Sequence, residues 1–97
     1  MKILVTILAF FIVLYSQAQA NDSLIIEYYP NGTIKKEGSI NAESGMYLGE
    51  VKEYYENGIL KGKYNYSDGN LNGKQYYYDE LGKEKKVENY DYGTIIE

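Results

Sequence analysis

The residues that could do chemistry in this 97-residue chain are almost all carboxylates, lysines and tyrosines. The sequence has no His and no Cys, and no serine lies in the glycine-flanked context of a nucleophile elbow, so no centre for nucleophilic catalysis is evident. The acidic residues alternate with lysines, as on a solvated strand face, and do not stand out as a glycosidase pair. We therefore predict that the chain is not an enzyme and has no catalytic residues.

The sharpest candidate for a metal site is the segment from residue 68 to residue 79. Four side chains fall at positions 1, 3, 5 and 12 of the calcium-loop pattern, those of Asp68, Asn70, Asn72 and Asp79. The last of them is not the longer Glu of that pattern, the flanking segments are rich in tyrosine, and a turn explains the glycines between them. We expect no metal and no cofactor, and keep a calcium- or carbohydrate-binding surface protein as an alternative.

Residues 1–20 have the organisation of a secretory signal peptide. Lys2 is followed by an apolar run over residues 3–15 and by Ala18-Gln19-Ala20, an A-x-A cleavage site. A transmembrane anchor is the alternative, but the apolar run is shorter than the ~20 residues that a span needs. We expect cleavage after Ala20, so that a single domain of residues 21–97 is exported to the periplasm or outside the cell and meets a membrane only during export.

The charge of the chain bears on its partners. The net charge is −4, all basic residues are lysines, and removal of Lys2 with the signal peptide leaves −5. An acidic product without Arg argues against nucleic acid and against anionic membrane surfaces. Without Cys the domain has no disulfides and depends on packing and hydrogen bonds alone.

A repeated phrase indicates how the exported domain is built. In residues 53–61 an aromatic strand end leads into Asn57-Gly58 and then into an apolar strand start, which is a strong hairpin pattern. Copies occur upstream with Asn31-Gly32 and downstream with Gly82, at offsets of 26 and 24 residues between the glycines. We predict three hairpins with these residues in the turns, and a two-residue type I′ loop at Asn57-Gly58 with positive φ at both positions.

That loop length sets the register of the central hairpin. One face would carry the pairs Tyr55–Leu60, Glu53–Gly62, Val51–Tyr64 and Gly49–Tyr66. The other face would carry Tyr54–Lys61, Lys52–Lys63 and Glu50–Asn65. We expect the first face, apolar, aromatic and rich in glycine, to be packed and the second, charged face to be solvated.

The outer copies depart from the central one. Pro30 has no N–H for the bond beside the turn, so we expect a wider first loop. In the third copy Leu81 replaces Asn, and polar residues occupy strand positions that are apolar in the second copy. We interpret the third hairpin as a polar capping unit.

With these phrases laid out, the chain resembles the bacterial variant of the MORN repeat. The resemblance rests on Tyr-Tyr-Glu-Asn-Gly at 54–58, Gly-Asn-Leu-Asn-Gly-Lys at 69–74 and Tyr-Tyr-Tyr at 76–78, and it covers about residues 27–90. It implies an all-β, elongated antiparallel meander of about three stacked hairpins. Members of this family are often described as antitoxin-like. Eukaryotic MORN repeats are linked to membranes and phosphoinositides, a role that transfers poorly to an acidic chain without Arg.

The 13 tyrosines suggest what the sheet does. Tyrosine suits a half-buried strand surface and also supplies contact area for partners. The apolar segment 94–96 could fold back on the third hairpin, pair with a second copy or accept a strand of a partner. The candidate partner surface is therefore Tyr76, Tyr78, Tyr90, Ile95 and Ile96. We predict an exported protein-binding or scaffolding module whose partner is an unknown protein, with an antitoxin or immunity protein as the alternative.

Overall fold

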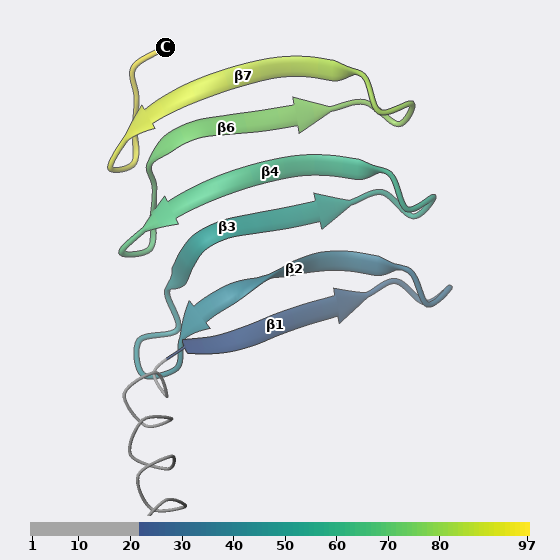
Figure 1. The fold of residues 1–97 in the computed structure, drawn as a ribbon, viewed down its shortest axis with the longest axis horizontal. Helices are drawn as coiled ribbons and strands as arrows, with labels where there is room; N and C mark the ends of the chain where they lie inside the picture. The colour runs from purple at the N-terminus through teal and green to yellow at the C-terminus, as the bar shows by residue number, and fades with distance from the viewer. Residues whose placement is uncertain (1–21) are drawn as a thin grey trace, which may run out of the picture.

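The computed structural model describes residues 22–97, and their regular structure consists of β-strands (Figure 1). The strands are β1 (Asp22–Tyr28), β2 (Ile34–Asn41), β3 (Tyr47–Tyr54), β4 (Leu60–Ser67), β5 (Asn70–Leu71), β6 (Gly73–Tyr78), β7 (Glu84–Asp91) and β8 (Thr94–Ile95). They form one antiparallel sheet in the order β1-β2-β3-β4-β6-β7-β8, with β5 beside β4. The predicted all-β meander of three hairpins is confirmed. The predicted signal peptide lies outside the described residues, and no helix within 22–97 is long and apolar enough to cross a membrane.

The predicted register of the central hairpin is confirmed along most of its length. Val51 pairs with Tyr64 and Glu53 with Gly62, as the alternation of apolar and charged residues required. The register changes only beside the loop, between Glu53 and Tyr54. This change of register results from the length of the loop.

The loop of the central hairpin has three residues, so the predicted type I′ turn at Asn57-Gly58 was wrong. The Gly58 N–H donates to the Tyr55 carbonyl (2.9 Å), and the Tyr55 N–H donates to the Ile59 carbonyl (2.8 Å). Gly58 has a φ of 89°, but Asn57 has no positive φ. This is a type I turn closed by a left-handed glycine, a common three-residue hairpin loop. The Asn57 side chain supports it by accepting the Ile59 N–H at 3.0 Å.

The same loop occurs in the first hairpin, which corrects the expectation of a wider loop there. The Gly32 N–H donates to the Tyr29 carbonyl (2.9 Å), and the Tyr29 N–H donates to the Thr33 carbonyl (2.8 Å). Pro30 therefore occupies the second position of a type I turn, where its fixed φ is favourable and no N–H is needed.

The third hairpin keeps this loop although Leu81 replaces Asn. The Gly82 N–H donates to the Asp79 carbonyl (2.9 Å), and Gly82 has a φ of 89°. The Asp79 carboxylate accepts the N–H groups of Leu81 and Lys83, both at 2.9 Å. An acidic side chain at the first position of the turn thus replaces the support that Asn57 gives in the second hairpin.

Each three-residue loop is followed by a bulge on the returning strand. Tyr54 pairs with Leu60 while Glu53 pairs with Gly62, so Lys61 is the extra residue. Leu60 therefore shares a face with Tyr54, and the predicted Tyr55–Leu60 and Tyr54–Lys61 pairs were wrong. The other hairpins have the same shift, with Lys35 and Lys85 as the extra residues.

The described residues form a single layer. On one face of the sheet the side chains therefore pack against one another and against the strands beneath them. We call the face that carries Val51, Gly62, Tyr64, Gln75 and Tyr77 the packed face. Val51 is 1% exposed and lies on Gly38, where an added Cβ would approach its Cγ2 to 2.9 Å. The Tyr64 ring covers Gly62 so closely that any side chain there would collide with it. Tyr64 also lies beside Tyr77, with ring centroids 5.5 Å apart.

Gln75, which is fully buried, supplies hydrogen bonds where the backbone pairing between β4 and β6 is interrupted. Backbone pairing of these strands is confined to Gly62–Tyr77 and Lys63–Tyr76. Next to these pairs the Gln75 side-chain oxygen accepts the Asn65 N–H (2.5 Å), and its amide nitrogen donates to the Asn65 carbonyl (3.2 Å). The side chain thus takes the place of a backbone partner, and no buried side-chain polar atom within 22–97 is left without a hydrogen bond.

Candidate interaction surface

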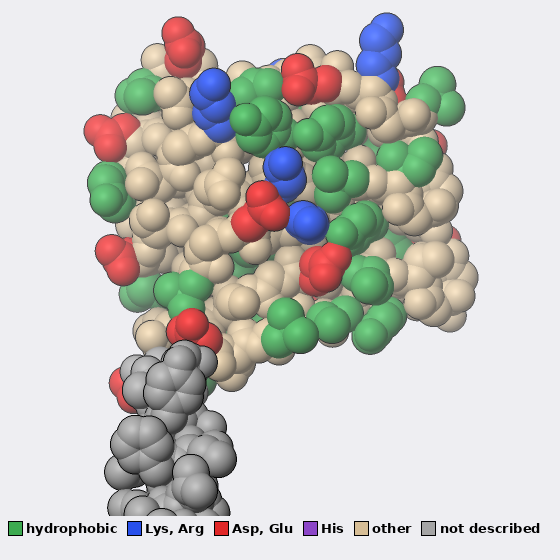
Figure 2. Space-filling model, viewed as in Figure 1, with side chains coloured by type: hydrophobic (Ala, Val, Ile, Leu, Met, Phe, Trp, Pro, Cys, Tyr) green, Lys and Arg blue, Asp and Glu red, His purple; other side chains and the backbone are tan. Residues whose placement is uncertain are grey.

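The opposite face, which we call the open face, carries a row of apolar side chains beside the hairpin loops. We call it the loop-end row, and its members are Tyr28, Ile34, Tyr54, Leu60 and Tyr78. It arises because the bulges pair Tyr28 with Ile34 and Tyr54 with Leu60, while Tyr78 holds the same position in the third hairpin. Figure 2 shows hydrophobic side chains gathered toward the loop ends of the hairpins, with lysine and acidic side chains nearer the middle.

The loop-end row is accessible to a partner. Tyr28 is 60% exposed, and the other four residues are half-buried. Ile34 and Tyr54 line a hollow of about 420 Å³ together with Glu37 and turn residues of the first two loops. In the described part of the chain no second layer covers this row, so its apolar area faces solvent.

Hydrogen bonds between neighbouring hairpins hold the strand ends that carry the row. The Tyr29 hydroxyl donates to the Tyr54 carbonyl (2.7 Å), and the Tyr55 hydroxyl donates to the Tyr78 carbonyl (2.8 Å). Each tyrosine thus fixes the backbone of a row residue in the next hairpin. The row is therefore positioned by the repeat itself.

The turn asparagines make a second set of such bonds. The Asn31 side-chain nitrogen donates to the Glu56 carbonyl, and the Asn57 nitrogen donates to the Glu80 carbonyl, both at 3.2 Å. In the third hairpin Asp79 stands where Tyr55 stands in the second, and Leu81 stands in place of Asn57. The third hairpin lacks both donors, which gives its interpretation as a capping unit a physical basis.

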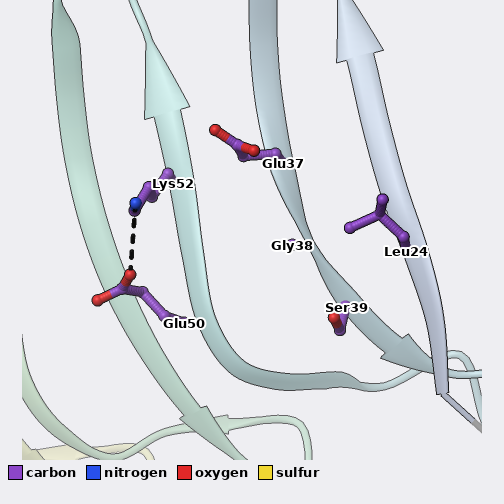
Figure 3. Close-up of a pocket in the computed structure, with 6 residues that line it drawn as sticks. All are labelled: Leu24, Glu37, Gly38, Ser39, Glu50 and Lys52. Carbon is purple, nitrogen blue, oxygen red and sulfur yellow. Dashed lines mark ion pairs between the residues drawn. The ribbon is translucent and has the colours of Figure 1, made fainter.

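The middle of the open face is charged. A hollow of about 220 Å³ is lined by Gly38 and Ser39 together with charged residues. Figure 3 shows Glu37, Glu50 and Lys52 among the residues that line it. Lys52 forms an ion pair with Glu50 at 3.7 Å, and the Glu37 carboxylate accepts the Tyr54 hydroxyl. Both carboxylates therefore have partners, and the arrangement makes a polar border for the loop-end row.

The contact with Glu37 has a consequence at high pH. Burial and this carboxylate raise the pKa of Tyr54 from 10.0 to about 12. Because the folded protein holds the neutral phenol more firmly than the unfolded chain does, this stabilisation is complete below pH 10 and is lost as pH rises toward 12. Burial also raises the pKa of Tyr64 and of Tyr77, so we expect ultraviolet titration to show a late-ionising phase that Tyr54→Phe reduces by one tyrosine. An unchanged late phase in that variant would contradict the Tyr54–Glu37 contact.

The predicted partner residues do not form one surface. Tyr76 and Tyr78 lie on the open face, because Tyr76 pairs with Lys63 and Val87. Tyr90 pairs with Gly73 and with Ile95, which places it on the packed face. The tail folds back on the third hairpin as β8, so of the three arrangements considered for it the structure has the first.

The predicted turn residues all lie in hairpin loops, whereas most of the loop-end row was missed. Asn31, Gly32, Asn57, Gly58 and Gly82 belong to the three loops described above. Four row residues, Tyr28, Ile34, Tyr54 and Leu60, were not proposed as contact residues. Their recurrence at the same distance before and after the turn glycines of the first two hairpins was a usable pattern once the loop length was known.

The possible calcium segment does not close into one loop. Asp68 precedes β6 and Asp79 follows it, so a whole strand separates the first and last candidate ligands. The Asn72 side chain is bonded to the Ser67 hydroxyl (3.3 Å) and to the Tyr92 N–H (3.1 Å). Within residues 22–97 no group of three or more acidic, His or Cys side chains could hold a metal ion.

Comparison with known families identifies two of the three hairpins. Residues 22–42 and 47–68 match the model of the MORN repeat variant, and these segments correspond to the β1–β2 and β3–β4 hairpins. The third hairpin lies outside the match, in agreement with its loss of the inter-hairpin donors. MORN repeats are often protein- or membrane-binding modules and are generally non-catalytic. No curated protein and no solved structure matched the chain.

Proposed function

We propose that this chain is an exported, non-catalytic module that binds a protein partner through the loop-end row. One observation carries the proposal: a continuous apolar row crosses three hairpins of a single-layer sheet and is left open to solvent. Export is supported by the signal-peptide pattern of residues 1–20. The absence of a nucleophilic centre in the sequence supports a binding role.

The composition of the surface favours a protein over other partners. Tyrosines at the centre of a contact with charged groups around them are typical of protein interfaces. The row has this arrangement, with Glu37, Glu50 and Lys52 beside it. The acidic chain without Arg is a poor match for nucleic acid or for anionic lipid headgroups.

An antitoxin or immunity protein is the more specific form of this proposal. It is supported only by the family resemblance, which is an association and not a site. If the chain is exported, a toxin bound by it would have to act outside the cytoplasm. Identification of the captured partner as a toxin would support this form, whereas specific retention of a polysaccharide would support the carbohydrate alternative.

Two matched tyrosines allow a direct test of the surface. Tyr28 in the row and Tyr92 in the turn after β7 are 60% and 61% exposed, so a lysine at either position should leave the fold intact. We expect Tyr28→Lys to reduce capture of the partner from envelope or secreted fractions about tenfold or more, the scale of an interface residue worth over 1 kcal/mol. Tyr92→Lys should have little effect. Equal capture by both variants would contradict the proposal.

A further inference from the structure

The two edges of the sheet differ in how they are protected. At the C-terminal edge, β8 pairs with β7 from Tyr90 to Asp91 and covers that end of the strand. The other end of β7 begins with the charged residues Glu84, Lys85 and Lys86. Covering segments and charged side chains are the usual means by which proteins block pairing at an edge.

The β1 edge is not covered by any described segment, and its charged residues, Asp22 and Glu27, lie near its two ends. Its seven residues contain no lysine and no proline, and none of the described residues pairs with its outer side. Leu24 is 71% exposed and Ile26 is 38% exposed, both on the open face. An edge strand of this kind presents unpaired backbone groups and apolar side chains to another strand.

We infer that β1 pairs with β1 of a second copy of this chain. The strands would run antiparallel about a two-fold axis perpendicular to the sheet, midway between Ile25 of one copy and Ile25 of the other. This inference concerns the backbone edge of β1, which shares only Tyr28 with the loop-end row, and it does not depend on the proposed function.

The residues of β1 complement their own strand in this register. Ile25 would face Ile25 of the second copy, Leu24 would face Ile26, and each carboxylate would face an uncharged residue. The latter pairs are Asp22 with Tyr28 and Ser23 with Glu27. All seven residues pair, and like charges do not face each other.

Other registers are less suitable. Pairing must preserve the two faces, so the register can move only by two residues at a time. Either shift leaves residues at the strand ends unpaired and places Leu24 or Ile26 opposite itself. Because the other edge is blocked, pairing stops at two copies and gives a closed dimer. The two loop-end rows would then lie on the same side of a continuous sheet, at opposite ends.

Cysteine crosslinking tests the register, because the chain has no cysteine of its own. Directly opposed strand residues have Cα atoms roughly 4.5–5.5 Å apart, which a disulfide can bridge. In protein produced from the full-length coding sequence, we expect Ile25→Cys to form a disulfide-linked dimer on mild oxidation. Ser23→Cys, on the same strand, and Ile96→Cys, at the other edge, should remain monomeric on a non-reducing gel.

Introducing charged residues at two β1 positions provides a second test, because unfolding alone cannot produce the expected pattern of loss and rescue of the dimer. Leu24→Lys with Ile26→Lys should convert the dimer to a monomer in light scattering, because lysines would face each other. Leu24→Lys with Ile26→Glu should restore the dimer, because only the register through Ile25 places the new lysine opposite the new glutamate. A wild-type monomer at all concentrations, a dimer that resists the first pair, or crosslinking through Ile96→Cys instead would overturn the inference.

Discussion

Gln75→Leu is expected to lower the free energy of unfolding by about 1–3 kcal/mol, since it leaves the Asn65 N–H without its hydrogen-bond partner. The side chain is fully buried and bonds to both the N–H and the carbonyl of Asn65, and also to the Gly73 carbonyl at 3.0 Å. Leucine has a similar volume but cannot make these bonds. For a small domain of marginal stability, this is a large part of the total.

Urea unfolding followed by circular dichroism would measure this loss. Lys74→Leu is a suitable control, because Lys74 precedes Gln75 in β6 and is exposed. Val51 occupies the equivalent position in the preceding hairpin. If this position required only an apolar side chain, Gln75→Leu would be neutral or stabilising. That result would contradict the view that Gln75 completes the β4–β6 pairing.

Gly58→Val is expected to destabilise the domain by about 1–3 kcal/mol, the scale of strain at a backbone position that disfavours side chains. A Cβ at Gly58 would meet no atom within 4 Å, so the cost comes from its φ of 89° and not from crowding. A β-branched residue tolerates this conformation poorly.

The conformational preference of the replacement residue distinguishes backbone strain from other causes. Gly58→Asn should recover much of the stability that Gly58→Val loses, because Asn adopts left-handed conformations more readily. The midpoints of urea unfolding for both variants give the comparison. An unchanged midpoint for Gly58→Val, or an equal loss for the two variants, would remove glycine conformation as the reason for this residue.

The register of the sheet could be predicted because it depends on local alternation. Val51, Glu53 and Gly62 fall on one face and Lys52 and Lys63 on the other, and a slip of one residue would exchange them. The existence of three hairpins followed from the repeat in the same way. These features needed no knowledge of neighbouring hairpins.

The loop type and the interaction surface could not be predicted so directly. Asn-Gly is compatible with both a two-residue and a three-residue loop. In the structure the Asn57 side chain also bonds to Glu80 in the next hairpin, a contact that the hairpin's own sequence does not contain. The extra loop residue then moves Leu60 to the open face beside Tyr54. The additional loop residue is therefore the reason that Leu60 lies in the loop-end row and not on the packed face.

Photocrosslinking at single tyrosines tests the proposed binding surface most directly. A photoreactive phenylalanine analogue would replace Tyr28 or Tyr78, at the two ends of the loop-end row, or Tyr92 as the control. After illumination in the native envelope or medium, mass spectrometry would identify the products and separate a partner protein from a second copy of this chain. We predict one partner protein linked from both row positions and not from Tyr92. Crosslinks from Tyr92 alone, or none from Tyr28 and Tyr78, would contradict the account.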